Sequence, residues 1–187
     1  MKSDLFSIPP VFYSFDTKSV FTHCLVCEGL LNDDCDYMIE KAFRQYNGYT
    51  AIDVIFECAI CMDCAIALQA GLSESSKRSI HGFINGHFNS EKRIKKILAI
   101  EKPEELMETC LINEKSKKDC EYYQVFALCK GNHLNMQMPP YMICDEALEE
   151  MHGLLSEKSK EDLGGFFKKH FAPDPDLFKN DLKLLLI

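Results

Sequence analysis

The pattern of hydrophobic and polar positions predicts a chain that mixes strands with helices. Aromatic and β-branched residues dominate several short runs, which is typical of strands. These runs are residues 36–46, 50–60, 121–129 and 133–143. An Asn-Gly pair at 47–48 and a Gly-Asn pair at 131–132 are turn signals, so we predict two hairpins. Prolines at 139–140 shorten the last strand or place it at a sheet edge.

A helix is expected after each hairpin, over residues 62–71 and 145–154. Ser73 and Ser156 are good N-caps for a second helix in each half. In these second helices apolar residues recur at helical spacing, and we interpret them as core. They are Ile80, Phe83, Ile84 and Phe88 in one helix, and Leu163, Phe166, Phe167 and Phe171 in the other.

Two segments of the chain repeat one another without a gap. The segment LSESSKRSIHGFINGHF, from residue 72, matches LSEKSKEDLGGFFKKHF, from residue 155. Upstream, HCLVCE resembles TCLINE in the same order. Such self-similarity predicts an internal duplication. We therefore expect an α+β fold of two tandem, pseudo-symmetric hairpin–helix repeats, which pack about a pseudo-two-fold axis because neither buries a large core alone.

The duplication sets the expected organisation of the chain. The predicted parts are an N-terminal arm (1–22), repeat 1 (23–89), a linker helix that ends at a proline (90–108), a degenerate repeat 2 (109–172) and a C-terminal tail (173–187). The tail ends in LKLLLI, an apolar run that we expect to pack against the body.

Composition and charge narrow the class of protein. A hydrophobic fraction of 47% in 187 residues is that of an ordinary globular protein, without an apolar run long enough to cross a membrane. The formal net charge of −8 argues against a nucleic-acid-binding protein. The N-terminus lacks the basic and apolar regions of a secretory signal, so we expect a cytoplasmic protein.

Ten cysteines are the unusual feature of the chain. In a reducing compartment, spaced cysteines indicate metal ligands or reactive thiols. Two C-x-x-C pairs stand out, Cys24 with Cys27 in HCLVC and Cys61 with Cys64 in CMDC. Structural zinc takes four ligands in a tetrahedron and prefers thiolates. Because a hairpin separates the pairs and a helix begins at the second, we predict one structural Zn²⁺ held by these four residues.

The order of a cysteine turn, a hairpin, and cysteines that open a helix resembles the treble-clef and zinc-ribbon group of zinc-binding domains. The matching residues are HCLVC and CMDCAIAL, which lie in repeat 1 only. The resemblance implies a structural zinc site. It is compatible with protein docking, nucleic-acid binding or a purely structural role, because modules of this group serve all three.

Some alternatives at the site remain open. Cys58 could pair with Cys61 in CAIC, although Cys58 belongs to the strand before the helix. His23 could replace a neighbouring cysteine as a ligand. An iron–sulfur cluster also takes four cysteines, but often in other spacings.

Repeat 2 lacks a complete ligand set. Its equivalent positions are Cys110, Asn113, Cys144 and Ala147. Two thiolates make a poor tetrahedral site, so we expect this repeat to be free of metal and stabilised by apolar packing. Three further cysteines are interpreted as small buried hydrophobic residues: Cys35, Cys120 and Cys129.

The sequence contains no catalytic motif, and four thiolates leave zinc no open position for a substrate. We therefore expect a non-enzymatic adaptor that binds another protein. One alternative is a nucleic-acid-associated regulator that uses basic residues in and after the linker: Lys92, Arg93, Lys95, Lys96, Lys115, Lys117 and Lys118. Another is a thiol-based redox or metal sensor that releases zinc on oxidation.

Overall fold

A five-stranded antiparallel sheet forms the centre of the protein in a computed structural model, which describes residues 6–46 and 48–171. Strands β2 (Ile52–Cys61), β1 (Asp36–Gln45) and β3 (Tyr122–Lys130) lie side by side in that order. Two short strands, β4 (His133–Leu134) and β5 (Tyr141–Cys144), pair with the other edge of β3. The predicted α+β class is confirmed.

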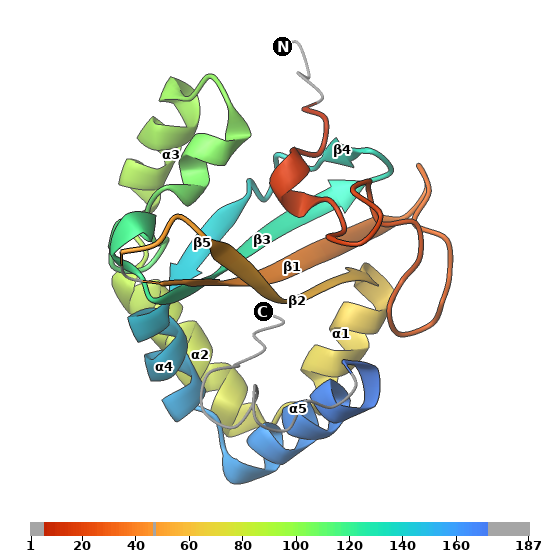
Figure 1. The fold of residues 1–187 in the computed structure, drawn as a ribbon. Helices are drawn as coiled ribbons and strands as arrows, with labels where there is room; N and C mark the ends of the chain where they lie inside the picture. Colours follow the sequence, from red (N-terminus) through yellow and green to blue (C-terminus); the bar gives the residue numbers. More distant parts are fainter. Residues whose placement is uncertain (1–5, 47, 172–187) are drawn as a thin grey trace.

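Five α-helices accompany the sheet within the described residues (Figure 1). Helices α1 (Met62–Gly71), α2 (Glu74–His87), α4 (Asp145–Gly153) and α5 (Glu157–His170) gather on one side of it. Helix α3 (Ser90–Ala99) stands at one end, and the N-terminal segment with a short 3-10 turn, η1 (Pro10–Phe12), lies on the opposite side. All of these helices are too short or too polar to cross a bilayer.

The central strands are buried because both faces of the sheet are covered. Strand β1 is buried without interruption from Tyr37 to Phe43. On the helical side, the ring of Phe56 makes an edge contact with Phe167 of α5, with ring centroids 5.3 Å apart. On the other side, Lys41 donates a hydrogen bond to the Tyr13 carbonyl at 2.5 Å. A continuously buried strand is the result of this double cover.

The helix predictions are largely confirmed. Helices α1 and α4 begin at the predicted residues. The hydroxyl oxygens of Ser73 and Ser156 accept hydrogen bonds from the backbone N–H groups of Ser76 and Ser159, which caps α2 and α5. The linker helix ends at Ala99, and Pro103 opens a 3-10 turn, η2 (Pro103–Met107).

The strand predictions need one correction. Residues 36–46, 50–60 and 121–129 correspond to β1, β2 and β3, although Asn47 of the first turn lies outside the described residues. The prediction of one continuous strand over 133–143 is wrong, because this run is divided into β4 and β5. The prediction that the prolines shorten the last strand or place it at a sheet edge is confirmed, since β5 is short and, among the described strands, pairs only with β3. The prolines at 139–140 have no N–H to donate to β3, so the ladder resumes only after them.

Pairing between β1 and β3 joins the two halves of the chain. The register extends from Asp36 opposite Lys130 to Arg44 opposite Tyr122. Residues from both halves therefore contribute to a single hydrophobic core.

A buried ion pair fastens the N-terminal segment to this sheet. Lys41 Nζ lies 2.8 Å from Glu57 Oε2, and the two side chains are only 4% and 16% exposed. The second carboxylate oxygen of Glu57 accepts a hydrogen bond from the Phe15 N–H at 2.7 Å. Since Lys41 also binds the Tyr13 carbonyl, two residues of the sheet hold the segment at two points.

Replacement of Lys41 by methionine is expected to lower the free energy of unfolding by about 3 kcal/mol, because the buried Glu57 carboxylate would lose its partner. The control is Lys130→Met, whose pair with Asp36 is 3.9 Å long and about half exposed. That change should cost no more than about 1 kcal/mol. Urea unfolding of both variants measures the difference, and equal losses would contradict a structural role for the buried pair.

Candidate metal centre

Four cysteines from two distant segments meet at one end of β2. Their Sγ atoms all lie within 4.8 Å of one another: Cys24, Cys27, Cys61 and Cys64. Because β2 runs antiparallel to β1, its last residue, Cys61, lies opposite Tyr37 at the beginning of β1. The first cysteine turn is attached to β2 directly, because the Leu25 N–H donates to the Ala59 carbonyl at 2.9 Å.

The conformation of the first turn presents its two thiols on one side. The Cys24 N–H donates to the Gly29 carbonyl at 2.9 Å, and the Glu28 N–H donates to the Cys24 carbonyl at 3.0 Å. Glu28 has a φ of +58°, a left-handed conformation that closes the reversal. A Cβ atom added to Gly29 would lie 3.3 Å from the Cys27 Sγ. A side chain at position 29 would therefore require the Cys27 thiol to shift by a few tenths of an ångström.

Backbone groups favour the anionic form of one thiol. The Val26 and Cys61 N–H groups each donate to the Cys24 Sγ at 3.4 Å. Although burial raises the pKa of Cys24, hydrogen bonds from Cys27, Cys61 and Val26 lower it overall to about 7. Cys61 is the N-cap of α1 and Cys64 lies in its first turn, where the helix dipole also stabilises negative charge.

The two thiols at the start of α1, those of Cys61 and Cys64, do not ionise readily by themselves. Burial raises the pKa of Cys61 and that of Cys64, and at Cys64 the neighbouring thiols Cys61 and Cys27 raise it further. A cluster with one favoured thiolate and two disfavoured ones suits a site that ionises fully only around a cation.

The spacing of one pair of sulfurs fits regular tetrahedral coordination, and all four sulfurs lie within 4.8 Å of one another. A zinc–sulfur distance of about 2.3 Å places two sulfurs of a regular tetrahedron about 3.8 Å apart. The Cys27 and Cys61 Sγ atoms are separated by 3.8 Å. Four thiolates would complete the coordination of such an ion and leave no position for a substrate or a catalytic water.

The cluster contains the CMDC pair rather than the CAIC pair. Cys58 is buried in β2 opposite Glu40 and lies outside the cluster. Burial raises the pKa of Cys58 well above its usual range, which disfavours a thiolate ligand. His23 also lies outside it, and its Nδ1 is 2.9 Å from the Thr22 hydroxyl oxygen.

The second half contains a turn of the same form with different side chains. The Ile112 and Cys144 N–H groups donate to the Cys110 Sγ at 3.4 Å, and Glu114 has a φ of +61°. Asn113 occupies the position that corresponds to Cys27, and its Oδ1 accepts a hydrogen bond from the Cys144 thiol at 3.3 Å. The neutral amide of Asn113 therefore accepts a hydrogen bond from the Cys144 thiol, and it cannot supply a thiolate as a cysteine at this position could.

Sequence reasoning missed the place of Cys120. We interpreted it as a small buried hydrophobic residue, and it is buried, but its thiol also donates a hydrogen bond to the Ser116 carbonyl at 3.4 Å. Hydrogen bonding to Cys144 raises the pKa of Cys120, while hydrogen bonds from Cys110 and Cys120 lower the pKa of Cys144. The sequence CEY at 120–122 matches CDY at 35–37, so Cys120 and Cys35 take matching positions shortly before β3 and β1.

Comparisons of the chain with protein-family models, with curated proteins and with solved structures find no significant match. The interpretation of the site rests on its own geometry.

Gly29 provides a test of this geometry. Gly29→Ala is expected to weaken zinc binding by about tenfold, because the new Cβ would displace the Cys27 Sγ from its position in the cluster. Gly71→Ala is the matched control, since a Cβ atom there meets nothing within 4 Å. Competition with a chromogenic chelator measures both affinities. Equal affinities would contradict the prediction that close packing at position 29 holds the Cys27 thiol in the cluster.

Proposed function

We propose that the protein is a non-enzymatic module in which one structural Zn²⁺ supports a surface for docking another protein. The observation that carries the proposal is the four-cysteine cluster, with two of its sulfurs at the separation expected for a zinc tetrathiolate. A complete set of protein ligands argues for stabilisation of the fold rather than for catalysis at the ion.

The far end of the β1–β2 hairpin supplies a candidate docking surface, which we call the hairpin tip. Tyr46, Tyr49 and Ile52 form it, and all three side chains are exposed, Tyr49 by 78%. Tyrosine and large apolar residues are enriched at the centres of protein interfaces. The metal cluster lies at the opposite end of the same hairpin, so zinc binding would hold the strands that present the tip.

We also propose that the two halves arose by duplication of one treble-clef-like unit. Support comes from the serines that begin α2 and α5. The Ser73 N–H donates to the Ser159 Oγ at 3.0 Å, and the Ser156 N–H donates reciprocally to the Ser76 Oγ at 2.9 Å. Such exchanged bonds are the pattern that a pseudo-two-fold axis requires.

The two cysteine turns support the same proposal. Cys24 and Cys110 each accept two backbone N–H groups at 3.4 Å, and the left-handed residues Glu28 and Glu114 follow at the same spacing. In this account the second unit kept the conformation of the turn while it lost two of the four ligands. The expected metal content is one ion per chain.

The lysines in and after the linker support nucleic-acid binding less well than the features above support a protein partner. Lys92 pairs with Glu114, Lys117 with Glu108, and Lys115 with both Asp145 and Glu146. Phosphate groups would have to compete with these carboxylates. A protein partner is therefore the better-supported proposal.

Metal analysis of purified protein tests the site. The wild type is expected to hold one equivalent of zinc, and Cys61→Ser to hold none. At a zinc concentration 100-fold above the dissociation constant, the ion would add about 2.7 kcal/mol to the free energy of unfolding, which the variant would lose.

Cys58→Ser is the matched control, because it changes a cysteine of the same strand outside the cluster. It should retain one equivalent of zinc whatever its effect on stability. Two equivalents in the wild type, or loss of zinc from Cys58→Ser, would contradict the proposed site.

Affinity capture from the native host tests the docking role. A partner retained by the wild type should be lost with Tyr49→Ser, which removes the most exposed ring of the hairpin tip, and kept with Leu98→Ser, which removes an exposed apolar residue of α3. Both variants should keep their zinc. A partner that both variants retain would show that the tip is not the docking surface.

A further inference from the structure

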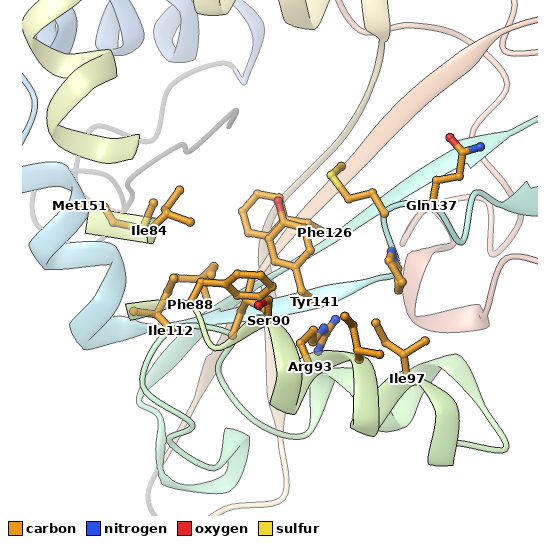
Figure 2. A pocket seen from close by; sticks show the side chains of 15 residues that line it. Ile84, Phe88, Ser90, Arg93, Ile97, Ile112, Phe126, Gln137, Tyr141 and Met151 are labelled. Carbon is orange, nitrogen blue, oxygen red and sulfur yellow. The ribbon is translucent and has the colours of Figure 1, made fainter. Parts of the chain in front are cut away.

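A cavity of about 430 Å³ lies between α3, the N-terminal end of β5 and the helical face of the sheet (Figure 2). This volume falls at the small end of the range for ligand sites, about 300–1,000 Å³. None of the clustered cysteines lines the cavity, so a ligand bound in it would not contact the metal centre.

The walls of the cavity are mostly apolar. They include Ile84 and Phe88 of the α2 end, Ile97 of α3, and Met151 of α4. The rings of Phe126 and Tyr141 are stacked on neighbouring strands, with centroids 4.9 Å apart at an angle of 13°. A hydrocarbon group would bury its surface here and replace water against these walls.

Arg93 brings a positive charge into this apolar space. Its Nη1 donates to the Leu106 carbonyl at 3.3 Å and its Nη2 to the Pro140 carbonyl at 2.6 Å, which fixes the guanidinium between α3, η2 and β5. A guanidinium has five N–H donors, so further donors remain for a ligand. Burial lowers the pKa of Arg93, which reflects the loss of water around the cation.

Among the residues that the structure describes, no carboxylate forms an ion pair with this guanidinium. Within residues 6–46 and 48–171, no acidic residue is among those that line the cavity. A partly buried cation that is balanced only by carbonyl dipoles is costly. An anionic group bound at Arg93 would offset that cost.

A second polar group lies beside the guanidinium. Ser90 is three residues before Arg93 on α3, so the two side chains share one face of the helix, and both line the cavity. Ser90 is exposed, whereas Phe126 and Met151 of the same lining are buried. Ser90 and Arg93 thus stand together on α3, Gln137 is a further polar residue of the lining, and the other lining residues are apolar.

We propose that this cavity binds a small apolar monocarboxylate, with its carboxylate on Arg93 and Ser90 and its hydrocarbon body against Phe88, Phe126 and Tyr141. Arginine is well suited to this role because its planar donors match the two carboxylate oxygens. An uncharged apolar molecule would leave the cation unbalanced, and a phosphate or nucleotide would place too much polar surface against the walls.

Three eight-carbon probes test the proposal on the full chain: octanoate, octanol and octylamine. Titrations followed by NMR of the isoleucine methyl groups should show saturable octanoate binding with shifts at Ile84, Ile97 and Ile143. Octanol should bind at least tenfold more weakly, and octylamine more weakly still. Equal affinities for octanoate and octanol, or shifts confined to residues outside the cavity, would overturn the proposal.

Variants of α3 test the role of the charge. Arg93→Gln should weaken octanoate binding by at least tenfold while octanol affinity changes less than twofold, which also shows that the cavity persists. Lys95→Gln is the matched control, because it removes a positive charge from an exposed position on the same helix outside the cavity. An equal effect of both variants would indicate a general charge effect and overturn the assignment.

Ser90→Ala keeps the proposal testable if Arg93→Gln does not fold. This change removes only an exposed hydroxyl group, so the fold should persist. Octanoate binding should weaken a few-fold with octanol binding unchanged. Loss of both ligands to the same degree would contradict carboxylate recognition at this end of the cavity.

Discussion

The backbone pairing of β1 with β3 is the constraint on which the rest of the structure depends. Each strand is central, so its N–H and C=O groups are satisfied on both edges and both of its faces are covered. The ladder sets where the flanking strands lie, and these strands in turn position the helices that come after them. The metal cluster at the end of β2 and the cavity beside β5 therefore occupy opposite edges of one rigid sheet.

The features that could be predicted from the sequence are those that local chemistry determines. The spacing of Cys24, Cys27, Cys61 and Cys64, together with a helix start at Met62, was enough to anticipate the four-sulfur cluster. Serine side chains marked the starts of α2 and α5 because an N-cap bond is made within one turn of chain. In such cases the residues that determine the feature lie within a few positions of one another or belong to a recognisable motif.

The features that could not be predicted depend on contacts between distant segments. The division of residues 133–143 results from the ladder on β3 and from prolines that cannot donate to it. The burial of Cys120 and the hydrogen bond from its thiol to the Ser116 carbonyl depend on the folded second half. Arg93 looked like one basic residue among several in the linker, and only the packing of α3 against Leu106 and Pro140 sets it apart.

The register of β1 with β3 has a consequence for the origin of the chain under the proposed duplication. The paired segments run antiparallel about a centre near Glu40 and Phe126, so a strand of this kind can pair with a second copy of itself. A single ancestral unit would have exposed that edge and formed a homodimer through it. Under the same proposal, fusion into one chain would have given the two units a high effective concentration for each other. One unit could then have lost its zinc ligands without loss of the assembly.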